Sequence, residues 1–170
     1  MQRYRILSID GGGVKGILPA IWLRAVEALL PNPLHTYFDI VAGCSSGAIT
    51  ACAIAGGHSA AQVVDIFKTD VQMAFPISWL RKIADPFGPT YPASGVEKLL
   101  TKHFGDKLFK DLHIPTMIVS YNMSKGCPAI FVSDNEEDGQ HKIKDLCRVS
   151  SAAPIYFPPA KLTIGTEEQA

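Results

Sequence analysis

The sequence lacks an excess of charge of either sign and lacks any long hydrophobic run. Its 170 residues include 16 lysines and arginines and 16 aspartates and glutamates, so the formal net charge is zero. No basic stripe is present, and binding to nucleic acid therefore has no electrostatic support. No uncharged apolar run approaches the roughly 18 residues that a membrane-spanning helix needs. The sequence thus predicts no transmembrane helix, and it leaves peripheral contact with lipid open.

The sequence also lacks the spacing of a metal site. The four cysteines, Cys44, Cys52, Cys127 and Cys147, show no C-x-x-C pattern. This argues against a zinc site and is typical of reduced thiols in a cytoplasmic protein. The chain enters a strand pattern by Tyr4, which leaves no room for a secretory signal peptide. We therefore predict a cytoplasmic protein without a metal, of undetermined oligomeric state.

What the sequence does contain is an alternation of strand and helix patterns. Its 47% of hydrophobic residues is enough to fill one core. Short apolar runs predict strands over residues 4–9, 39–44, 114–121 and 129–133. Helical patterns cover residues 17–30, 46–56, 60–68, 94–104 and 141–151, with Ser94 and Glu97 expected to form a capping box. The last two strands flank a turn and are expected to pair or to neighbour each other. The alternation predicts one α/β domain with a mainly parallel sheet.

The stretch GCSSG at residues 43–47 matches G-x-S-x-G, with Ser45 at its centre. A predicted buried strand leads into it and a helix of small residues leads out. This is the setting of a nucleophile elbow, in which a strained turn exposes the serine hydroxyl. Gly43 and Gly47 remove side chains that would collide with neighbouring elements. Ser46 lacks glycines at both second neighbours and is expected to cap the helix instead.

The stretch DGGGVKG at residues 10–16 also lies between a predicted strand and a helix. Gly11, Gly13 and Gly16 match G-x-G-x-x-G, so a dinucleotide site is one interpretation. That site needs an acidic residue at the carboxyl end of the second strand, whereas Asp39 lies at its beginning. The alternative is an oxyanion hole, because glycines let backbone N–H groups face a substrate without a Cβ. The ends of two parallel strands lie at the same edge, so this loop and Ser45 are expected to meet.

These residues resemble the patatin-like phospholipase family. DGGGVKG is similar to the family's glycine-rich oxyanion loop, and GCSSG to its nucleophile elbow. The segments YPASGVEKLLTKHFGDKLFKDLHIPTMIVSYNMSKG and VSSAAPIYFPPA are also similar to the family, so the resemblance covers most of the chain. It implies a three-layer α/β/α fold, a phospholipid or other acyl-lipid substrate, and no metal or organic cofactor.

The resemblance also implies roles for individual residues. Ser45 is expected to be the nucleophile of a Ser–Asp dyad. The oxyanion hole is expected from Gly11, Gly12 and Gly13, with the N–H of Val14. Lys15 stands where the family usually has arginine or lysine, and its charge is expected to stabilise the loop.

The sequence departs from the family at the catalytic aspartate. The family's D-G-[GA] motif is expected after FPPA, but the segment KLTIGTEEQA does not contain it. We therefore expect the fold to continue past Ala170 and this domain to be truncated. Asp134, just after a predicted strand, is a weak substitute. The alternative function is a catalytically incompetent fragment that binds lipid or a partner protein.

Two further features bear on the site. A Ser-His-Asp triad would need one of five histidines, His35, His58, His103, His113 and His141, and none has a motif context. Residues 72–92, rich in proline and aromatic side chains, are expected to form a loop that either faces lipid or is pinned to the core.

Overall fold

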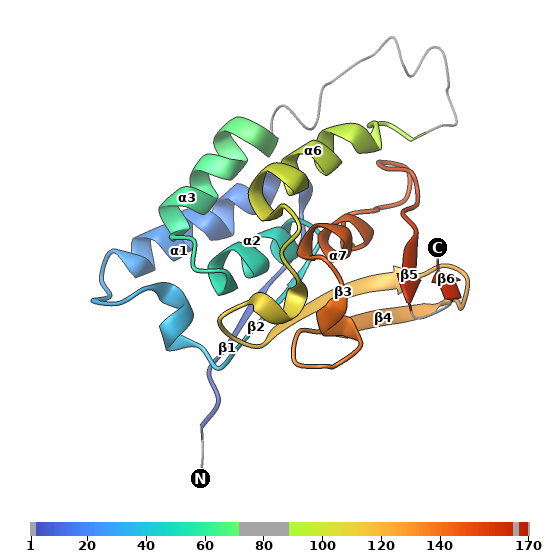
Figure 1. Ribbon diagram of the computed structural model, residues 1–170. Coiled ribbons are helices and arrows are strands. Elements are labelled where there is room, and N and C mark those ends of the chain that lie inside the picture. Colours follow the sequence, from blue (N-terminus) through green and yellow to red (C-terminus); the bar gives the residue numbers. More distant parts are fainter. Residues whose placement is uncertain (1–2, 72–88, 165–166, 170) are drawn as a thin grey trace.

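The computed structural model describes residues 3–71, 89–164 and 167–169, and Figure 1 shows a sheet with helices packed against it. The strands are β1 (Ile6–Ile9), β2 (Ile40–Cys44), β3 (Thr116–Asn122), β4 (Cys127–Val132), β5 (Leu162–Ile164) and β6 (Glu167–Gln169). The α-helices are α1 (Ile17–Glu27), α2 (Ser46–Ala55), α3 (Ala60–Asp65), α6 (Ala93–Phe104) and α7 (Ile143–Ser150). The described residues also form short 3-10 helices, η1 (Gly13–Gly16), η2 (Leu34–Tyr37), η4 (Phe109–Asp111) and η5 (Asp138–Gln140), and a π-helix, η3 (Ile66–Val71), follows α3.

The main sheet has the strand order β1-β2-β3-β4, and β5 pairs with β6 separately. β1, β2 and β3 are parallel, and β4 returns antiparallel to β3 after a tight turn. Ile9 lies beside Gly43, and Cys44 lies beside Val119, so the carboxyl ends of β1 and β2 lie together, with β3 alongside. The predicted α/β fold with a mainly parallel sheet is confirmed, as is the predicted pairing of β3 with β4.

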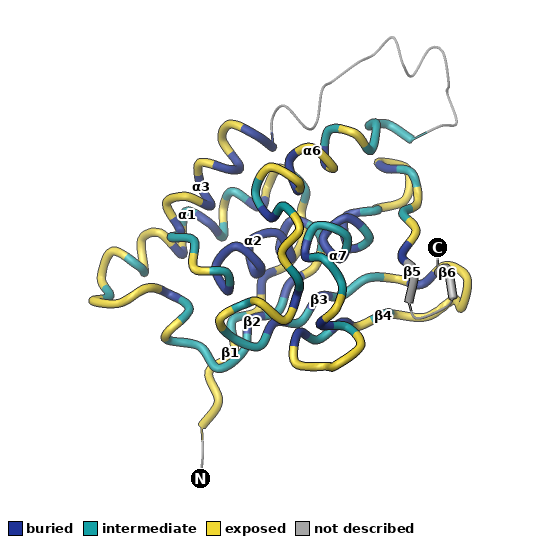
Figure 2. Tube along the Cα trace, in the orientation of Figure 1, coloured by how far each residue is buried: buried dark blue, intermediate teal, exposed yellow. Residues whose placement is uncertain are grey.

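The core lies between the sheet and the helices α2 and α7. Side chains alternate along each strand, and Val41 and Ile118 on the face beneath these helices are fully buried. α2 is buried along its whole length, as Figure 2 shows. Its side chains are all small or apolar, which allows this burial. On the opposite face Ile6, Tyr121 and Ile130 are each more than half exposed.

Several helix boundaries differ from the sequence-based expectation. The helix predicted over residues 60–68 ends at Asp65, where η3 follows, and the helix predicted over residues 141–151 runs from Ile143 to Ser150. The helix predicted over residues 17–30 ends at Glu27 and continues as a turn. The helix expected to begin after Ser94 begins at Ala93, with Pro92 in the capping position and no side-chain cap. The predicted capping box was therefore wrong. Glu97 instead accepts a hydrogen bond from Arg148 Nε at 3.3 Å, which ties α6 to α7.

Within residues 3–71, 89–164 and 167–169, no helix combines the length and the hydrophobicity that crossing a bilayer requires.

Candidate active site

Ser45 occupies a strained turn between β2 and α2. Its φ of 54° and ψ of −123° lie in a region that residues other than glycine rarely adopt. Such conformations typically cost about 1–3 kcal/mol and persist only where the surrounding structure enforces them. Ser45 stands in the N-cap position of α2, yet its side chain makes no capping hydrogen bond. The Ser45 hydroxyl therefore does not cap the start of α2 and remains available for a reaction.

Gly43 and Gly47 allow the turn to pack against the strands. A Cβ on Gly43 would collide with the backbone carbonyl of Gly47, and a Cβ on Gly47 would collide with the carbonyl of Ile9. Both obstacles are backbone atoms of packed elements, so neither can move aside cheaply. The two glycines of the motif are thus required by close packing between β1, β2 and the start of α2.

The glycine-rich loop lies directly against this turn. A Cβ on Gly11 would lie 2.8 Å from the carbonyl oxygen of Cys44 and 2.9 Å from the Cβ of Ser45. A Cβ on Gly16 would lie 2.7 Å from the ring of Phe67 and 2.9 Å from the Cβ of Ser46. The loop that follows β1 and the serine that follows β2 are therefore in contact, as expected from parallel strands ending at one edge.

Ser46 links the two segments and does not cap the helix. It is the first residue of α2, its side chain is buried, and its Oγ accepts a hydrogen bond from the N–H of Gly12 at 3.0 Å. The expected capping role of Ser46 was wrong, because the strained turn moves the N-cap position to Ser45. The N–H of Gly12 is engaged in this bond. Gly13 and Val14 follow it at the start of η1, where N–H groups have no partner within the helix.

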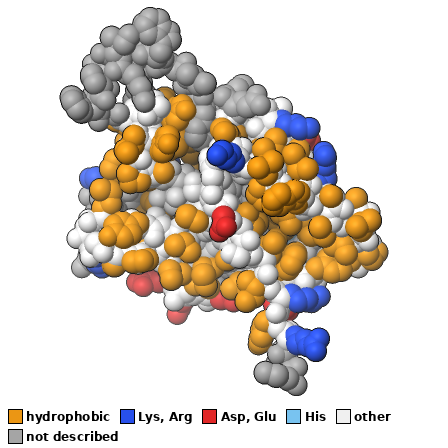
Figure 3. Space-filling model, turned by 180° about the vertical axis from the view of Figure 1, so that it is seen from behind, with side chains coloured by type: hydrophobic (Ala, Val, Ile, Leu, Met, Phe, Trp, Pro, Cys, Tyr) orange, Lys and Arg blue, Asp and Glu red, His pale blue; other side chains and the backbone are white. Residues whose placement is uncertain are grey.

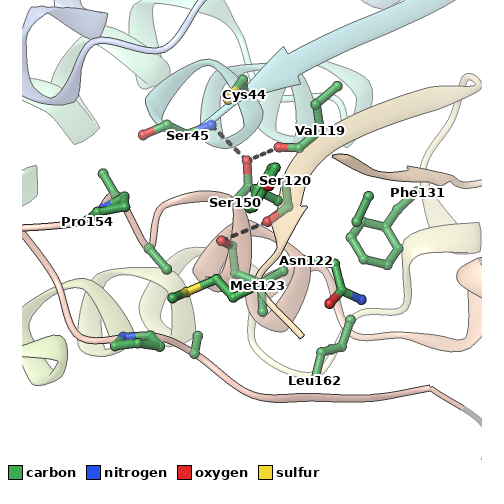
Figure 4. Close-up of a pocket in the computed structure, with 17 residues that line it drawn as sticks. Cys44, Ser45, Val119, Ser120, Asn122, Met123, Phe131, Ser150, Pro154 and Leu162 are labelled. Atoms are coloured by element: carbon green, nitrogen blue, oxygen red, sulfur yellow. Dashed lines mark hydrogen bonds between the residues drawn. The ribbon is translucent and has the colours of Figure 1, made fainter. Parts of the chain in front are cut away.

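Ser150 at the end of α7 fixes the turn from the other side. The N–H of Ser45 donates to Ser150 Oγ at 2.8 Å, and Ser150 donates its own hydrogen to the carbonyl of Val119 at 2.7 Å. Figure 4 shows this chain of bonds from the turn through α7 to β3. Sequence reasoning missed Ser150. The available signal was two serines at the buried end of an amphipathic helix, where hydroxyl groups need partners.

Ser45 lines two separate cavities. One has a volume of about 480 Å³ and is also lined by Gly12, Gly13, Val14 and Lys15. The other, drawn in Figure 4, has a volume of about 340 Å³ and lies beside the ends of β3 and α7. Both volumes fall in the range of small-molecule sites, roughly 300–1,000 Å³. The predicted site residues therefore converge on one place, with an apolar space on each side of the serine.

The histidines lie elsewhere. None of the five lines either cavity that contains Ser45. His103 contacts Asp70 at 2.7 Å, and His35 packs edge-on against His113 with ring centroids 5.0 Å apart. His58 Nδ1 lies 3.2 Å from the carbonyl of Ala53, and His141 packs against Phe131. Nothing in this arrangement supports a histidine-based triad.

Asp39 and Asp134, the two acidic residues discussed from the sequence, also lie away from Ser45. Asp39 accepts a hydrogen bond from the N–H of Arg5 at 2.7 Å, which places it at the amino end of the sheet, as predicted. Asp134 follows β4 beyond Val132, which pairs with Met117 near the start of β3. That is the opposite end of the strand from Ser45, so Asp134 does not serve as the substitute base. Among the described residues, no group of three or more potential metal ligands is present.

Two of the four cysteines are buried and two are exposed. Cys52 and Cys147 are fully buried, and burial raises the pKa of the Cys52 thiol well above its usual value, as does its neighbour Cys147. These two behave as small core residues. Cys44 and Cys127 are exposed free thiols, and Cys44 lines the smaller cavity beside Ser45.

Most of the aromatic loop predicted over residues 72–92 lies outside the described residues, as do Phe75, Trp79, Leu80, Arg81, Lys82 and Phe87. Its described end is attached to the segment after α7. The N–H of Tyr91 donates to the carbonyl of Tyr156 at 2.8 Å, and the Tyr91 ring lies 5.7 Å from that of Phe157. Tyr91 lines the larger cavity.

Comparisons with known proteins agree with one another. A family model described as patatin-like phospholipase matches residues 7–166. A cGAMP-activated phospholipase of Escherichia coli (strain TW11681) is 32% identical over 92% of this chain and 48% of its own length. A patatin of Solanum tuberosum is 30% identical over 91% of this chain and 43% of its own length. The chain thus spans about half the length of the curated relatives it matches. VipD from Legionella pneumophila shares the fold, with a TM-score of 0.64 and 17% identity over 99% of this chain and 45% of its own.

Proposed function

The chain belongs to the patatin-like phospholipase family, and we propose that it hydrolyses acyl ester bonds of lipids with Ser45 as the nucleophile. The observation that carries this proposal is the contact between two motifs. A strained serine whose hydroxyl is not used for capping lies against a glycine-rich loop, with room for substrate beside both. The carboxyl edge of a parallel sheet is also where ligands of open α/β proteins bind.

In the proposed reaction, Ser45 Oγ attacks the ester carbonyl carbon and the carbonyl electrons move to its oxygen. The loop Gly11–Gly12–Gly13–Val14 supplies the oxyanion hole. The N–H groups of Gly13 and Val14 are the donors, because the N–H of Gly12 is held by Ser46. The general base takes the proton of the Ser45 hydroxyl and passes it to the oxygen of the departing alcohol as the ester C–O bond breaks. Water then cleaves the acyl-enzyme, which releases the carboxylic acid and restores the serine. Losing one such donor typically lowers kcat about 100- to 1,000-fold.

We propose that the general base is an aspartate of a D-G-[GA] segment beyond residue 170. Among the described residues, Ser45 hydrogen-bonds to another side chain through its backbone N–H, which is the donor. Its hydroxyl has no carboxylate or imidazole partner among these residues. A chain extended through such a segment should hydrolyse esters faster than residues 1–170. Equal rates would contradict this part of the proposal, but not the role of Ser45.

A fluorophosphonate probe tests the nucleophile. Residues 1–170 should be labelled at Ser45, as located by mass spectrometry, and Ser45→Ala should not be labelled. Ser59→Ala is a matched control, because Ser59 caps α3 away from both cavities. Absence of labelling in both the 170-residue and the extended chain would favour the alternative, a non-catalytic fragment that binds lipid or a partner.

We also propose that the protein is cytoplasmic, because its cysteines are free thiols.

We further propose that the protein contacts lipid surfaces peripherally. Val14 borders the larger cavity and is half exposed. Leu18, Trp22 and Val26 follow at four-residue intervals along α1, so these three exposed side chains lie on one face of that helix. Figure 3 shows hydrophobic side chains gathered in broad patches on the back of the molecule. Vesicle flotation of the wild type and of Trp22→Ser should show weaker binding by the variant.

A further inference from the structure

The two cavities that share Ser45 differ in how closely they are enclosed. The walls of the larger cavity include Phe67, Val71, Val96 and Leu99, whose side chains are 3% to 5% exposed. They come from η3 and α6. The smaller cavity is rimmed by Tyr121 and Met123, which are 59% and 60% exposed. Val14 and Tyr156 at the mouth of the larger cavity are about half exposed, so both spaces reach the surface. The larger one extends deeper between buried side chains of the helical layer, and we call it the enclosed cavity and the other the open cavity.

The two cavities also differ in their relation to the glycine-rich loop. Gly12, Gly13 and Val14 line the enclosed cavity, and none of them lines the open one. An ester carbonyl that uses the N–H groups of this loop must therefore sit on the enclosed side of Ser45. The acyl carbon next to the carbonyl then starts at the mouth of the enclosed cavity.

The order of the chemical steps separates the two halves of an ester. The acyl group stays bonded to Ser45 until water attacks, so it benefits from a closed apolar site. The alcohol half must leave after the first step, and water must enter in its place, so it needs an open route. The enclosed cavity meets the requirement of the acyl group, and the open cavity meets that of the alcohol.

On the basis of the proposed function, we propose that the enclosed cavity between η1, α2, η3 and α6 binds the acyl chain, and that the open cavity beside β3 holds the alcohol half of the lipid. Leu99 and Val96 lie three residues apart on one face of α6 and form part of the chamber wall. They are thus the residues that set the acyl-chain length. Each methylene buried there should strengthen binding about fourfold.

The preference can be measured without turnover. Alkyl fluorophosphonates of increasing alkyl length, from ethyl to dodecyl, place the alkyl chain where the acyl chain would lie. Ser45 Oγ forms a bond to phosphorus, the P–F bond breaks, fluoride leaves, and the serine proton passes to solvent. The second-order rate of labelling is recorded for each chain length, for the wild type and for each variant.

Leu99→Phe should narrow the cavity and lower the ratio of dodecyl to ethyl labelling rates about tenfold or more. Leu99→Ala should widen it and move the preference to longer chains. Val96→Phe is a second narrowing variant in case Leu99→Phe does not fold, and melting temperatures identify that case. Met123→Trp, on the rim of the open cavity, is the matched control and should leave the alkyl-length ratio unchanged.

Three results bear on the proposal in different ways. An alkyl-length ratio that responds to the α6 variants and not to Met123→Trp supports it. A ratio that responds to Met123→Trp, or that stays constant in folded α6 variants, overturns the assignment of the cavities while Ser45 remains the nucleophile. Absence of labelling at Ser45 by every probe overturns the proposed function itself, and with it this assignment.

Discussion

The backbone N–H of Ser45 donates a hydrogen bond of 2.8 Å to the hydroxyl of Ser150, a residue 105 positions further along the chain. Ser150 is buried and passes its own hydrogen to the carbonyl of Val119. The strained turn is therefore held from outside by α7 and β3. The part-buried N–H of Ser45 would be left unsatisfied if it lost this partner. We infer that Ser150 positions Ser45 without itself taking part in the chemistry.

Replacement of Ser150 by alanine tests this role. Ser150→Ala should lower the free energy of unfolding by about 1–3 kcal/mol, because it leaves the part-buried N–H of Ser45 and the carbonyl of Val119 without this partner. The labelling rate of Ser45 by a fluorophosphonate should fall as the turn relaxes. Ser150→Thr keeps the hydroxyl and should restore labelling.

The adjacent Ser151 provides the matched control. Ser151 is also buried, but its Oγ is the one buried side-chain oxygen or nitrogen in the described part of the chain that has no hydrogen-bond partner. Ser151→Ala should leave the free energy of unfolding unchanged or raise it, measured by urea denaturation under the same conditions. Equal losses in the two variants would show that the hydrogen bonds of Ser150 do not matter.

The bond between Gly12 and Ser46 predicts a separable effect on reactivity. Ser46→Ala removes the acceptor of the Gly12 N–H and should loosen the loop, lowering the Ser45 labelling rate about tenfold. The stability cost should be small, about 0.5–1.5 kcal/mol for one hydrogen bond. Thr50→Val is the control, because Thr50 Oγ1 donates to the carbonyl of Ser46 at 3.1 Å, one turn further along α2. It should cost similar stability but leave labelling unchanged.

The glycines of the two motifs should differ in their tolerance of a side chain. Gly43→Ala should abolish folding or destabilise it by several kcal/mol, because its Cβ meets the backbone of Gly47. Gly12→Ala should fold, since a Cβ there meets only the Cβ of Lys15 at 3.6 Å and the φ of 179° lies outside the left-handed region. Circular dichroism during thermal unfolding distinguishes the two. A stable Gly43→Ala protein would contradict the packing described for the elbow.

The buried carboxylate of Asp70 at the end of η3, which is paired with the exposed Lys102, predicts a pH dependence of stability. The Lys102 ammonium, 2.8 Å from Asp70, lowers the pKa of that carboxyl below its usual value, with a further contribution from His103 at 2.7 Å. A carboxyl whose pKa is lowered in the folded state adds stability above its unfolded pKa. That stability is lost as the pH falls through the folded value.

Asp70→Asn should therefore have a lower melting temperature than the wild type at pH 7. The difference should shrink below about pH 3.9, the ordinary aspartate pKa. Asp106→Asn is the control, since Asp106 is an exposed carboxyl paired with Lys142 and Lys144 and should have little effect on stability. A difference between Asp70→Asn and the wild type that is constant from pH 7 to pH 3 would exclude the ion pair as its cause.

The amino-acid sequence by itself determined the strands, most of the helices and the two motifs, because each depends on neighbours within a few residues. The strand, turn and helix around Ser45 are encoded between Asp39 and Gly56. The parallel order of β1 and β2 then brings their carboxyl ends together. For the same local reason, the small residues of α2 predict its close packing against the sheet.

Only the tertiary structure decided how these parts are held and what surrounds them. The partner of the Ser45 N–H lies on α7, and Ser46 became the support of the Gly12 loop because the strained turn shifted the start of α2. The enclosed cavity is built by η3 and α6, which no periodicity connects to Ser45. Hydrophobic patterns report whether a side chain is buried. They do not report which distant group it meets, because that depends on how the helices cross the sheet.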